Sequence, residues 1–423
     1  MKITIITGGS RGDVQPYIAL GVGLKKAGHT LCMPAPEIFR SLITESGLEF
    51  ISIKSIDPVE LAKSMEIHKA AGSKNKVMFI RTVFNELKPY IRAFYDEIWE
   101  ASKGSEAIIS TLSIPAAQAI AEKLGIPCIY APLLPVHPTS VFHSPFTPGF
   151  FNIGLYNRIS HKLLEQIIWQ PTRSILNSWQ KDVLGLKPLS FWGPFRKIYK
   201  RSEPVLYGYS ELVVPKPLDW PSSIHITGYW FLDEPEGWQP PVGLEDFLNA
   251  GPPPVYIGFG SMIDKEPERM TGIVLDSLKT SGQRGILSEG WSGLGSEKLP
   301  DTIFKVGSIP HSWLFKRMAA TVHHGGAGTT AASLRSGVPS IVTPFLGDQP
   351  FWGQRIYSLG IGPKPVPYNK LSSEVLARLI NTAIKDSKMK SRASEFGKRI
   401  KSENGVEKAV YIIEKFLRQD RKG

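Results

Sequence analysis

Cysteine is scarce in this chain of 423 residues, which contains only Cys32 and Cys128. Both lie in apolar, strand-like segments, which indicates reduced core residues and argues against a disulfide scaffold. The sequence has no apolar run of about 18 residues, so it predicts no transmembrane helix. It also has no internal repeat and no low-complexity tract. His, Cys and carboxylate residues do not recur at the spacing of metal ligands, so we expect no metal site.

Acidic residues are outnumbered by basic ones, 38 against 50, which gives a formal net charge of +12. The Lys and Arg residues are spread among acidic ones and no motif that reads DNA or RNA is present, so we expect no nucleic acid partner. A nucleotide diphosphate or an anionic membrane surface fits this charge better. The first eight residues form a short apolar run that enters a glycine loop, which is typical of a first strand and not of a signal peptide. The sequence therefore predicts a cytoplasmic protein.

Apolar strands alternate with helices through both halves of the chain. In the first half the predicted strands are residues 3–6, 31–33, 50–53, 107–110 and 128–131. In the second half they are residues 255–259, 285–287, 303–306, 321–323 and 340–343. This alternation predicts an α/β fold with two doubly wound parallel sheets, in two domains of about 200 residues each. Residues 233–254 are rich in Pro and Gly and are interpreted as the linker between the domains.

A glycine-rich segment, residues 322–349, has the pattern of a strand, a tight turn, a short helix and a second strand. The glycines of the turn let backbone N–H groups approach a ligand closely; they are Gly325, Gly326 and Gly328. Thr329 opens the helix, whose N-terminus carries unpaired N–H groups and the positive end of the helix dipole. His324 can add an imidazole donor to a phosphate oxygen. The segment is therefore interpreted as a diphosphate site, although an ordinary turn between a strand and a helix would show the same glycines.

Two polar residues follow the second strand of this segment. Asp348 and Gln349 offer a carboxylate and an amide, which suit the vicinal hydroxyls of a hexose because they accept from some and donate to others. The alternative is that Asp348 caps a helix that begins near Pro350. A sugar-binding Asp348 should tolerate replacement by Ala with an unchanged melting temperature, whereas a cap should lose stability.

The glycine-rich segment resembles the nucleotide-sugar signature of family 1 glycosyltransferases and, more closely, its form in the sterol glucosyltransferase branch. Residues 8–16 resemble the N-terminal loop of that branch, and residues 214–217, 227–230 and 251–261 resemble its interdomain region. The resemblance covers essentially the whole chain and is weakest at residues 60–99.

This resemblance implies the GT-B architecture, in which two Rossmann-like domains face each other across a cleft. Residues 1–232 are then the acceptor-binding domain, and residues 255–423 are the domain that binds the nucleotide sugar. The last helix of the chain is expected to pack back on the first domain.

Asp13 is our candidate for the catalytic base. The resemblance places it where a family 1 enzyme carries a histidine in a Gly-His-x-x-Pro context, which reads GDVQP at residues 12–16 here. In plant members an aspartate after a later strand orients that histidine, and Thr111 stands at the matching position. The two departures fit together. A carboxylate base has no tautomer for a partner to fix, and a second carboxylate beside Asp13 would raise the pKa of Asp13. The alternative is that Asp13, in the loop after the first strand, only caps a helix that begins near Gln15.

The resemblance also implies which residues hold the nucleotide. The candidates for diphosphate binding are His324, Gly326, Gly328, Thr329 and Ser261. These groups supply the positive field that the leaving group needs, so no metal ion is required. The candidates for nucleoside binding are Ser308, Ile309 and His311. Here the pattern departs from the family's Trp and Gln, and the usual ribose-binding Glu is Ala332, so the choice between UDP and dTDP stays open.

Aromatic residues gather in the later part of the first half, from Phe142 to Tyr199. Most are expected to be core, and the others to line an apolar pocket for a lipophilic alcohol. The candidates for the acceptor pocket are Ser10, Thr111, His137, Phe142 and His143. Residues 191–199 mix aromatic and basic side chains and are also a candidate for peripheral contact with a membrane from which such an acceptor is drawn.

These observations predict an inverting glycosyltransferase that moves a hexose, with glucose favoured, from a UDP-sugar to a hydroxyl of a sterol, terpenoid, polyphenol or similar molecule. The UDP-sugar is a co-substrate, and no further cofactor is expected. A GT-B sugar-nucleotide epimerase would share the donor site and lack the acceptor pocket. A non-catalytic protein that binds a lipid or a nucleotide sugar would keep the fold without the chemistry, which the presence of Asp13, His324, Asp348 and Gln349 argues against.

Overall fold

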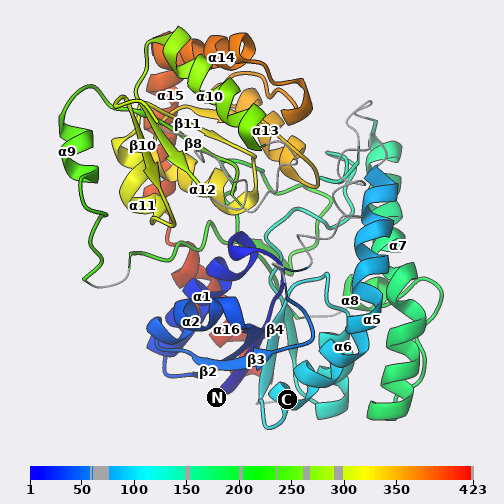
Figure 1. Cartoon of the computed structure of the whole chain (residues 1–423). Helices are drawn as coiled ribbons and strands as arrows, with labels where there is room; N and C mark the ends of the chain where they lie inside the picture. Colours follow the sequence, from blue (N-terminus) through cyan, green and yellow to red (C-terminus); the bar gives the residue numbers. More distant parts are fainter. Residues whose placement is uncertain are drawn as a thin grey trace. The chain divides into compact units, whose positions relative to one another are not determined.

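The computed structural model describes residues 1–57, 60, 76–147, 153–199, 203–234, 237–260, 267–289 and 299–420. Contacts between residues divide the chain into two units (Figure 1). The first unit combines Met1–Leu232 with the C-terminal segment Asn404–Gly423, and the second unit is Asp233–Glu403. Each unit is built on its own parallel sheet, which confirms the predicted fold class.

The first unit contains a seven-stranded sheet in the order β3-β2-β1-β4-β5-β6-β7. Neighbouring strands pair in parallel, for example Ile3 of β1 with Leu31 of β2 and with Ala107 of β4. The strands are β1 (Lys2–Ile6), β2 (Thr30–Pro36), β3 (Glu49–Ile53), β4 (Ala107–Ser110), β5 (Cys128–Tyr130), β6 (Val205–Tyr207) and β7 (Ile224–Ile226). The first five overlap the predicted strands. β6 and β7 are not among the predicted strands.

Helices cover both sides of this sheet (Figure 1). They are α1 (Arg11–Lys26), α2 (Arg40–Glu45), α5 (Lys76–Ser102), α6 (Ala116–Leu124), α7 (Gly154–Trp179), α8 (Phe195–Tyr199) and α16 (Gly405–Asp420). α5 packs against α7, and α1 packs against α16. Ile413 of α16 belongs to the same buried cluster as Ile3 and Ile5 of β1, so the C-terminal helix completes the core of the first unit.

The second unit contains a five-stranded parallel sheet in the order β10-β9-β8-β11-β12. Its strands are β8 (Val255–Gly258), β9 (Gly285–Ser288), β10 (Ile303–Val306), β11 (Ala320–His323) and β12 (Ser340–Val342). Its helices are α9 (Leu244–Asn249), α10 (Pro267–Ser281), α11 (His311–Leu314), α12 (Ala327–Ser336), α13 (Gln349–Ser358), α14 (Ser373–Lys385) and α15 (Ser387–Lys401). α10 and α14 pack against each other, and Val274 and Leu376 from them join Val255 and Ile257 of β8 in one buried cluster.

α9 lies within residues 233–254, the segment predicted to be a linker. Leu244 at its start is fully buried in a cluster with Tyr256 of β8 and Phe315. The Arg284 guanidinium lies 4.1 Å from the centre of the Phe247 ring. This part of residues 233–254 is therefore packed within the second unit.

Cys32 lies in β2 and Cys128 in β5, and both side chains are buried without a disulfide. The prediction that they are core residues is confirmed. Within the described ranges, no helix combines the length and the hydropathy that crossing a membrane requires. In the same residues, no group of three or more His, Cys, Asp or Glu side chains is arranged to hold a metal ion.

In both sheets, successive strands are first added on one side of the first strand and then on its other side. This reversal of strand order falls between β1 and β4 in the first sheet and between β8 and β11 in the second. In an open parallel sheet, ligands bind outside the carboxyl ends of the strands at such a reversal. Ile6 pairs with Ser110, so the segments that begin at Thr7 and Thr111 leave the first sheet side by side. Gly258 pairs with His323 in the same way, which brings residues 259–260 next to His324.

Candidate active site

Asp13 lies in the first turn of α1, so its expected position in a loop is wrong. The helix begins at Arg11, and Pro16 stands inside it instead of in its first turn, where proline is most common. Ser10 is the N-cap residue. The Asp13 carboxylate accepts hydrogen bonds from the backbone N–H of Ser10 at 2.8 Å and from its hydroxyl at 2.9 Å. Asp13 and Ser10 therefore form a reciprocal capping arrangement, which leaves the second carboxylate oxygen outside these two bonds.

The pKa of the Asp13 carboxyl is raised above its ordinary value, because desolvation by the surrounding protein outweighs the hydrogen bonds from Ser10. The side chain is nevertheless exposed to solvent, so a ligand can reach it. Gly9 has a φ of +120°, and a Cβ at this position would lie 2.5 Å from Asp13 Oδ2. The glycine thus supplies the turn and leaves room for the carboxylate. A carboxylate with a raised pKa accepts a proton more readily.

Thr111 lies close to the start of α1, because it follows β4 at the point where the chain leaves β1 beside it. The Tyr17 hydroxyl, one turn after Asp13, donates to the carbonyl oxygen of Ala131 at 2.6 Å and is also hydrogen-bonded to Thr111. Burial raises the pKa of the Tyr17 phenol; the Thr111 bond opposes this effect and the charge of Asp13 adds to it. Asp13, Tyr17 and Thr111 therefore form one cluster. Tyr17 is not among the predicted site residues, although its spacing of four from Asp13 on a helix is a signal that could have found it.

His137 is buried, with 4% of its side chain exposed. Its Nδ1 lies 2.6 Å from the Tyr207 hydroxyl, and its ring contacts those of Tyr199, Tyr207 and Trp220. Burial lowers the pKa of His137 to about 3, so the ring is neutral at pH 7. This position fits a residue of the aromatic core better than one that touches an acceptor.

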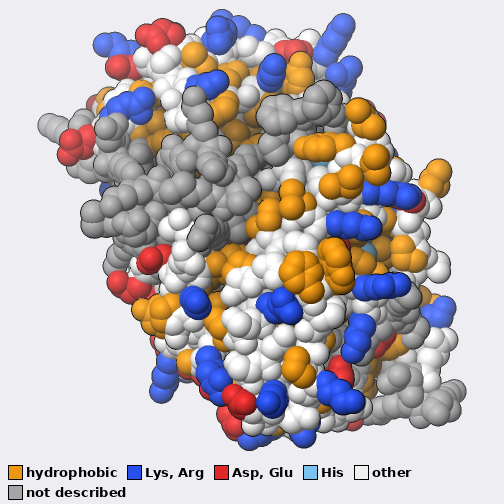
Figure 2. Space-filling model, turned by 90° about the vertical axis from the view of Figure 1, so that its right-hand side faces the viewer, with side chains coloured by type: hydrophobic (Ala, Val, Ile, Leu, Met, Phe, Trp, Pro, Cys, Tyr) orange, Lys and Arg blue, Asp and Glu red, His pale blue; other side chains and the backbone are white. Residues whose placement is uncertain are grey.

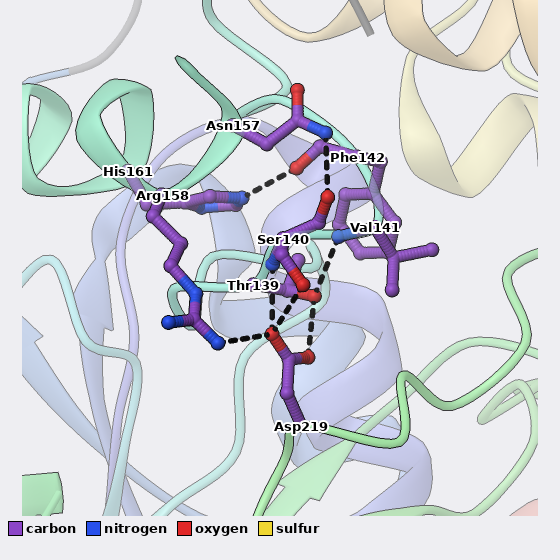
Figure 3. Close-up of polar contacts among 8 residues, drawn as sticks. All are labelled: Thr139, Ser140, Val141, Phe142, Asn157, Arg158, His161 and Asp219. Atoms are coloured by element: carbon purple, nitrogen blue, oxygen red, sulfur yellow. Dashed lines mark hydrogen bonds and ion pairs between the residues drawn. The ribbon is translucent and has the colours of Figure 1, made fainter. Parts of the chain in front are cut away.

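The loop that carries Phe142 and His143 is held by a single carboxylate from far along the chain (Figure 3). Asp219 accepts from the Thr139 hydroxyl at 2.6 Å, and from the backbone N–H and the hydroxyl of Ser140 at 2.8 and 2.9 Å. No local pattern in the sequence predicts the role of Asp219, because about 80 residues separate it from its partners.

α7 holds the same loop from its other side (Figure 3). The Asn157 side chain donates to the carbonyl oxygen of Ser140 at 2.8 Å. The His161 Nε2 lies 3.1 Å from the carbonyl oxygen of Phe142. Nδ1 of His143 lies 2.8 Å from the carbonyl oxygen of Ser144, and both Phe142 and His143 are half-buried. The loop is therefore fixed on two sides, with these two side chains partly accessible.

Replacement of Asp219 by Ala is expected to lower the free energy of unfolding by about 1–3 kcal/mol, because Thr139 and Ser140 lose a shared acceptor. Although desolvation raises the pKa of Asp219, its hydrogen bonds outweigh that effect and hold the pKa at about 2, below the ordinary 3.8. The ionised carboxylate therefore contributes its stability above about pH 4, and this contribution is lost as the pH falls through 2. Thermal melts from pH 7 down to pH 2 follow this loss. Asp219→Asn, which keeps an acceptor oxygen, should lose less, and equal melting of all three proteins would contradict the expectation.

The glycine-rich turn of the second unit ends in an open helix N-terminus. α12 begins at Ala327, two residues earlier than expected, and Gly326 is its N-cap residue. The first backbone bond of the helix runs from the Thr330 N–H to the carbonyl oxygen of Gly326, at 2.9 Å. The N–H groups of Ala327, Gly328 and Thr329 precede this bond, so they have no partner within the helix. The predicted diphosphate residues Gly326, Gly328 and Thr329 thus lie together at the positive end of α12.

His324 lies against the backbone of both loops at the second strand reversal. A Cβ on Gly326 would lie 2.5 Å from its Nε2, and a Cβ on Gly260 would lie 2.8 Å from its Cε1. Its Nδ1 is buried and has no hydrogen-bond partner among the described residues. Burial lowers the pKa of His324 to about 4, so the ring is neutral at pH 7 and carries one N–H. Ser261, the next predicted diphosphate residue, lies outside the described residues.

His323, one residue before, fixes the turn. The Gly325 N–H donates to its Nδ1 at 3.0 Å, so the ring proton is on Nε2, which lies 2.7 Å from the Ser340 hydroxyl. Burial lowers the pKa of His323 well below its ordinary value. Both ring nitrogens of His323 therefore form hydrogen bonds within the protein, whereas Nδ1 of His324 has no partner among the described residues.

Two candidates for nucleoside binding, Ser308 and Ile309, lie between β10 and α11, and the third, His311, is the first residue of α11. Ser308 is exposed, while Ile309 is 8% exposed and belongs to a buried cluster, so only its backbone can face a ligand. The His311 ring stacks on the Phe315 ring, with centroids 4.3 Å apart. The segment therefore offers one exposed polar side chain and one half-buried ring.

Asp348 and Gln349 both support the segment that leads into α13. Gln349 is 4% exposed, and its Oε1 accepts from the backbone N–H groups of Phe345 and Leu346 at 2.7 and 3.1 Å. Asp348 stands at the N-cap position, but its side chain makes no capping bond. Instead, its Oδ2 accepts from the indole Nε1 of the buried Trp352 at 2.7 Å.

The expectation that Asp348→Ala leaves the melting temperature unchanged is therefore corrected. The buried indole N–H of Trp352 would lose its acceptor, and we expect the free energy of unfolding to fall by about 1–3 kcal/mol. Asp348→Asn keeps an acceptor oxygen and should melt close to the parent protein. Melting curves, combined with competition between UDP-glucose and UDP-galactose, separate the two roles. If Asp348→Asn keeps the parent's stability and its choice of sugar, the carboxylate does not bind the sugar.

Two family models match the chain. The model of the glycosyltransferase family 28 N-terminal domain matches residues 3–143, and the model of the erythromycin biosynthesis protein CIII-like C-terminal domain matches residues 286–413. The first match contains Asp13 and Thr111, and the second contains the glycine-rich turn.

Curated relatives match nearly the whole chain. A sterol 3-beta-glucosyltransferase of Cryptococcus neoformans var. neoformans serotype D is 37% identical over 438 residues, which cover 98% of this chain and 27% of the relative. A sterol 3-beta-glucosyltransferase of Arabidopsis thaliana is 36% identical over 426 residues, which cover 99% of this chain and 66% of the relative. The chain thus spans about a quarter of the fungal protein and just under two thirds of the plant protein.

Solved structures share the fold over the full length. The glycotransferase of kitacinnamycin aligns with a TM-score of 0.70 at 18% identity, covering 98% of this chain and 99% of its own. The calicheamicin glycosyltransferase CalG4 aligns with a TM-score of 0.68 at 16% identity, covering 99% and 98%. The predicted resemblance and the predicted fold class are both confirmed. The chain is therefore a glycosyltransferase with a family 28 N-terminal domain and an erythromycin biosynthesis protein CIII-like C-terminal domain; it is homologous to the sterol 3-beta-glucosyltransferases and shares the GT-B fold of the solved glycosyltransferases.

Proposed function

We propose that the chain is an inverting glycosyltransferase that moves glucose from UDP-glucose to the hydroxyl of a sterol or a similar lipophilic alcohol. The observation that carries this proposal is the similarity of almost the whole chain, at 36–37% identity, to proteins named sterol 3-beta-glucosyltransferases. Acceptor binding is assigned to the first unit and donor binding to the second. A sterol dissolves in lipid, so peripheral contact with a membrane is part of the proposal.

In the proposed reaction Asp13 is the base. Its carboxylate takes the proton of the acceptor hydroxyl while the hydroxyl oxygen bonds to the anomeric carbon of glucose. The bond between that carbon and the phosphate oxygen breaks, and its electron pair leaves with UDP. Attack opposite the leaving group inverts the configuration, so an α-linked donor gives a β-glucoside. The raised pKa of Asp13 and its accessibility support this role.

Thr111 and Tyr17 are proposed as positioning residues beside the base. The Tyr17 hydroxyl ties α1 to the end of β5 through Ala131, and Thr111 shares that hydroxyl. Ser10 holds one oxygen of the Asp13 carboxylate in place. The proton would then be taken by a carboxylate whose orientation is already fixed, which lowers the entropy cost of reaction.

The diphosphate is proposed to bind at the N-terminus of α12. The N–H groups of Gly328 and Thr329 and the neutral ring of His324 supply hydrogen-bond donors, and the helix dipole favours the charge that grows on the leaving UDP. Gly326 and Ser261 are the two remaining candidates for diphosphate binding. At position 326 glycine leaves space for the His324 ring, which a side chain there would strike. Buried polar groups are rarely without a partner, so the unpartnered Nδ1 of His324 also supports a ligand here.

The nucleoside, the glucose and the acceptor are assigned to the other candidate residues, with the buried Gln349 and His137 in supporting positions. Ser308 and His311 are proposed to contact the nucleoside, together with the backbone of Ile309. Asp348 is proposed to accept from glucose hydroxyls. Gln349, which was also predicted to bind the sugar, is 4% exposed and its Oε1 accepts from two backbone N–H groups, so we propose that it orients the loop beside Asp348. Ser10, Thr111, Phe142 and His143 are proposed to contact the acceptor, with His137 supporting them from the aromatic core.

An acceptor screen tests the proposal. The purified chain is incubated with UDP-glucose and a panel of sterols, terpenoids and polyphenols, and mass spectrometry detects alcohols that gain one hexose. Parallel reactions with UDP-galactose and dTDP-glucose define the donor. A sugar-nucleotide epimerase would convert UDP-glucose without any alcohol, and a non-catalytic binding protein would bind UDP-glucose without forming product. Either result would overturn the proposal.

A further inference from the structure

The outward side of α7 carries a row of exposed apolar side chains. Leu155, Ile159 and Leu163 follow one another at intervals of four residues, so they lie on one side of the helix. They are 71%, 52% and 52% exposed, and Ile153 directly before the helix is 59% exposed. Single exposed hydrophobic residues need no explanation, but a contiguous row of them marks an interaction site.

The residues that follow α7 extend this row. Gln166 and Gln170 lie on the same side of the helix by their spacing, and both donate to backbone carbonyls of the segment that follows. Gln170 donates to Phe191 at 2.9 Å, and Gln166 to Trp192 at 3.5 Å. The Phe191 and Trp192 side chains are 51% and 66% exposed. We call the following set the α7 apolar face: Ile153, Leu155, Ile159, Leu163, Phe191 and Trp192.

Basic residues border the α7 apolar face. Lys162 lies within the row itself, and the Arg173 guanidinium lies 5.3 Å from the centre of the Phe191 ring. Arg196 and Lys197 follow in α8, and both are exposed. Figure 2 shows this side of the molecule, where hydrophobic side chains lie among those of Lys and Arg.

Acidic residues do not balance this charge. Glu165 is the only acidic residue of α7; its carboxylate accepts a hydrogen bond from the Tyr199 hydroxyl at 2.7 Å and also interacts with the charge of Lys162, so one acidic residue of this helix stands against four basic residues. Arg158 forms an ion pair with Asp219 at 3.3 Å, so its charge is already balanced. The face therefore combines apolar side chains, one of them Trp, with a net positive border.

We infer that the α7 apolar face docks on the surface of a membrane that contains anionic lipids. Apolar side chains on one side of a helix, with Trp at the interface and Lys or Arg beside them, are the features of a segment that lies in the headgroup region. The positive border complements anionic headgroups. A second copy of the chain is a poorer partner, because pairing two such faces would bring eight basic residues of like charge together. The inference rests on the membrane contact of the proposed function and names the surface that makes it, whereas vesicle binding can be measured without any glycosyl transfer.

Flotation with lipid vesicles tests the inference. The full chain should float with vesicles of phosphatidylcholine and phosphatidylserine, bind less to phosphatidylcholine alone, and dissociate as salt is raised. The double variant Leu155→Gln/Ile159→Gln should bind at least about tenfold more weakly, since Gln keeps the helix and removes the apolar row. Lys162→Gln and Lys197→Gln should each weaken binding by about fivefold. The matched control is Val242→Gln in the second unit, where a fully exposed apolar residue is replaced and binding should not change.

Melting curves and UDP affinity establish that each variant is folded, because exposed positions should tolerate these changes. Equal binding of the parent protein and the Leu155→Gln/Ile159→Gln variant would overturn the inference, as would a failure of the parent protein to bind either kind of vesicle. Sedimentation analysis adds a separate outcome. A dimer that the same double variant dissociates, without any lipid binding, would show that a second copy covers this face and would also overturn the inference.

Discussion

Asp13→Asn is expected to lower kcat for glucosyl transfer by about 10² to 10⁴ while the affinity for UDP stays unchanged. An amide cannot take the proton of the acceptor hydroxyl, but its oxygen can still accept the two hydrogen bonds that Ser10 donates to Asp13. The capping arrangement of α1 should therefore survive, so the loss would report the chemistry and not the fold. Steady-state kinetics and calorimetry with UDP measure the two effects separately. Parent-like turnover in a folded Asp13→Asn protein would remove Asp13 from the role of base.

The pH dependence of kcat/KM gives an independent reading of the same residue. The base must be ionised, so kcat/KM should fall as the pH is lowered through the pKa of Asp13, which is raised above the ordinary 3.8. Ser10→Ala removes the hydroxyl that lowers this pKa, and the acid limb of the profile should move to higher pH. A residue that only capped the helix would lose stability in Ser10→Ala without moving that limb.

His324→Ala is expected to weaken the binding of UDP and of UDP-glucose to a similar extent, by about 10- to 100-fold. This range corresponds to the loss of one hydrogen bond to a charged group, about 1.5–3 kcal/mol. Both ligands should be affected, because the proposed contact is with the diphosphate and not with the hexose. His324→Gln, which keeps an N–H donor, should recover part of the affinity.

Stability must be measured beside affinity in these His324 variants. The ring lies against the backbone of Gly260 and Gly326, so its removal leaves a space between the loops after β8 and β11. Calorimetry with UDP should therefore be paired with thermal melts. If His324→Ala melts lower and yet binds UDP as tightly as the parent, the ring packs the two loops and does not contact the diphosphate.

Local patterns in the sequence predicted the parts of the fold that local interactions determine. The glycine-rich turn and the helix α12 after it follow from residues within one short segment, although α12 begins two residues earlier than expected. The start of α1 was missed because Pro16 is tolerated inside the helix, although proline is more common in a first turn. α9 was missed in a segment rich in Pro and Gly, where the burial of Leu244 against Phe315 decides the structure.

The polar partners of the candidate site depend on tertiary structure, so the sequence could not identify them. Nothing near Asp219 indicates that it holds Thr139 and Ser140. Likewise, the bond from Trp352 to Asp348 changes the expected effect of a substitution without any change in the motif. The chemical type of each residue was readable from the sequence, whereas the neighbours with which it pairs were not.

The central claim is tested most directly by measuring UDP and glucoside in one reaction of the chain with UDP-glucose and a 3β-hydroxysterol. We expect one UDP to be released for each sterol glucoside formed, no release when the sterol is omitted, and a β-configured product in the proton NMR spectrum. The Asp13→Asn protein should form far less of both products. Release of UDP without the sterol, or an α-configured glucoside, would contradict an inverting glucosyl transfer to this acceptor.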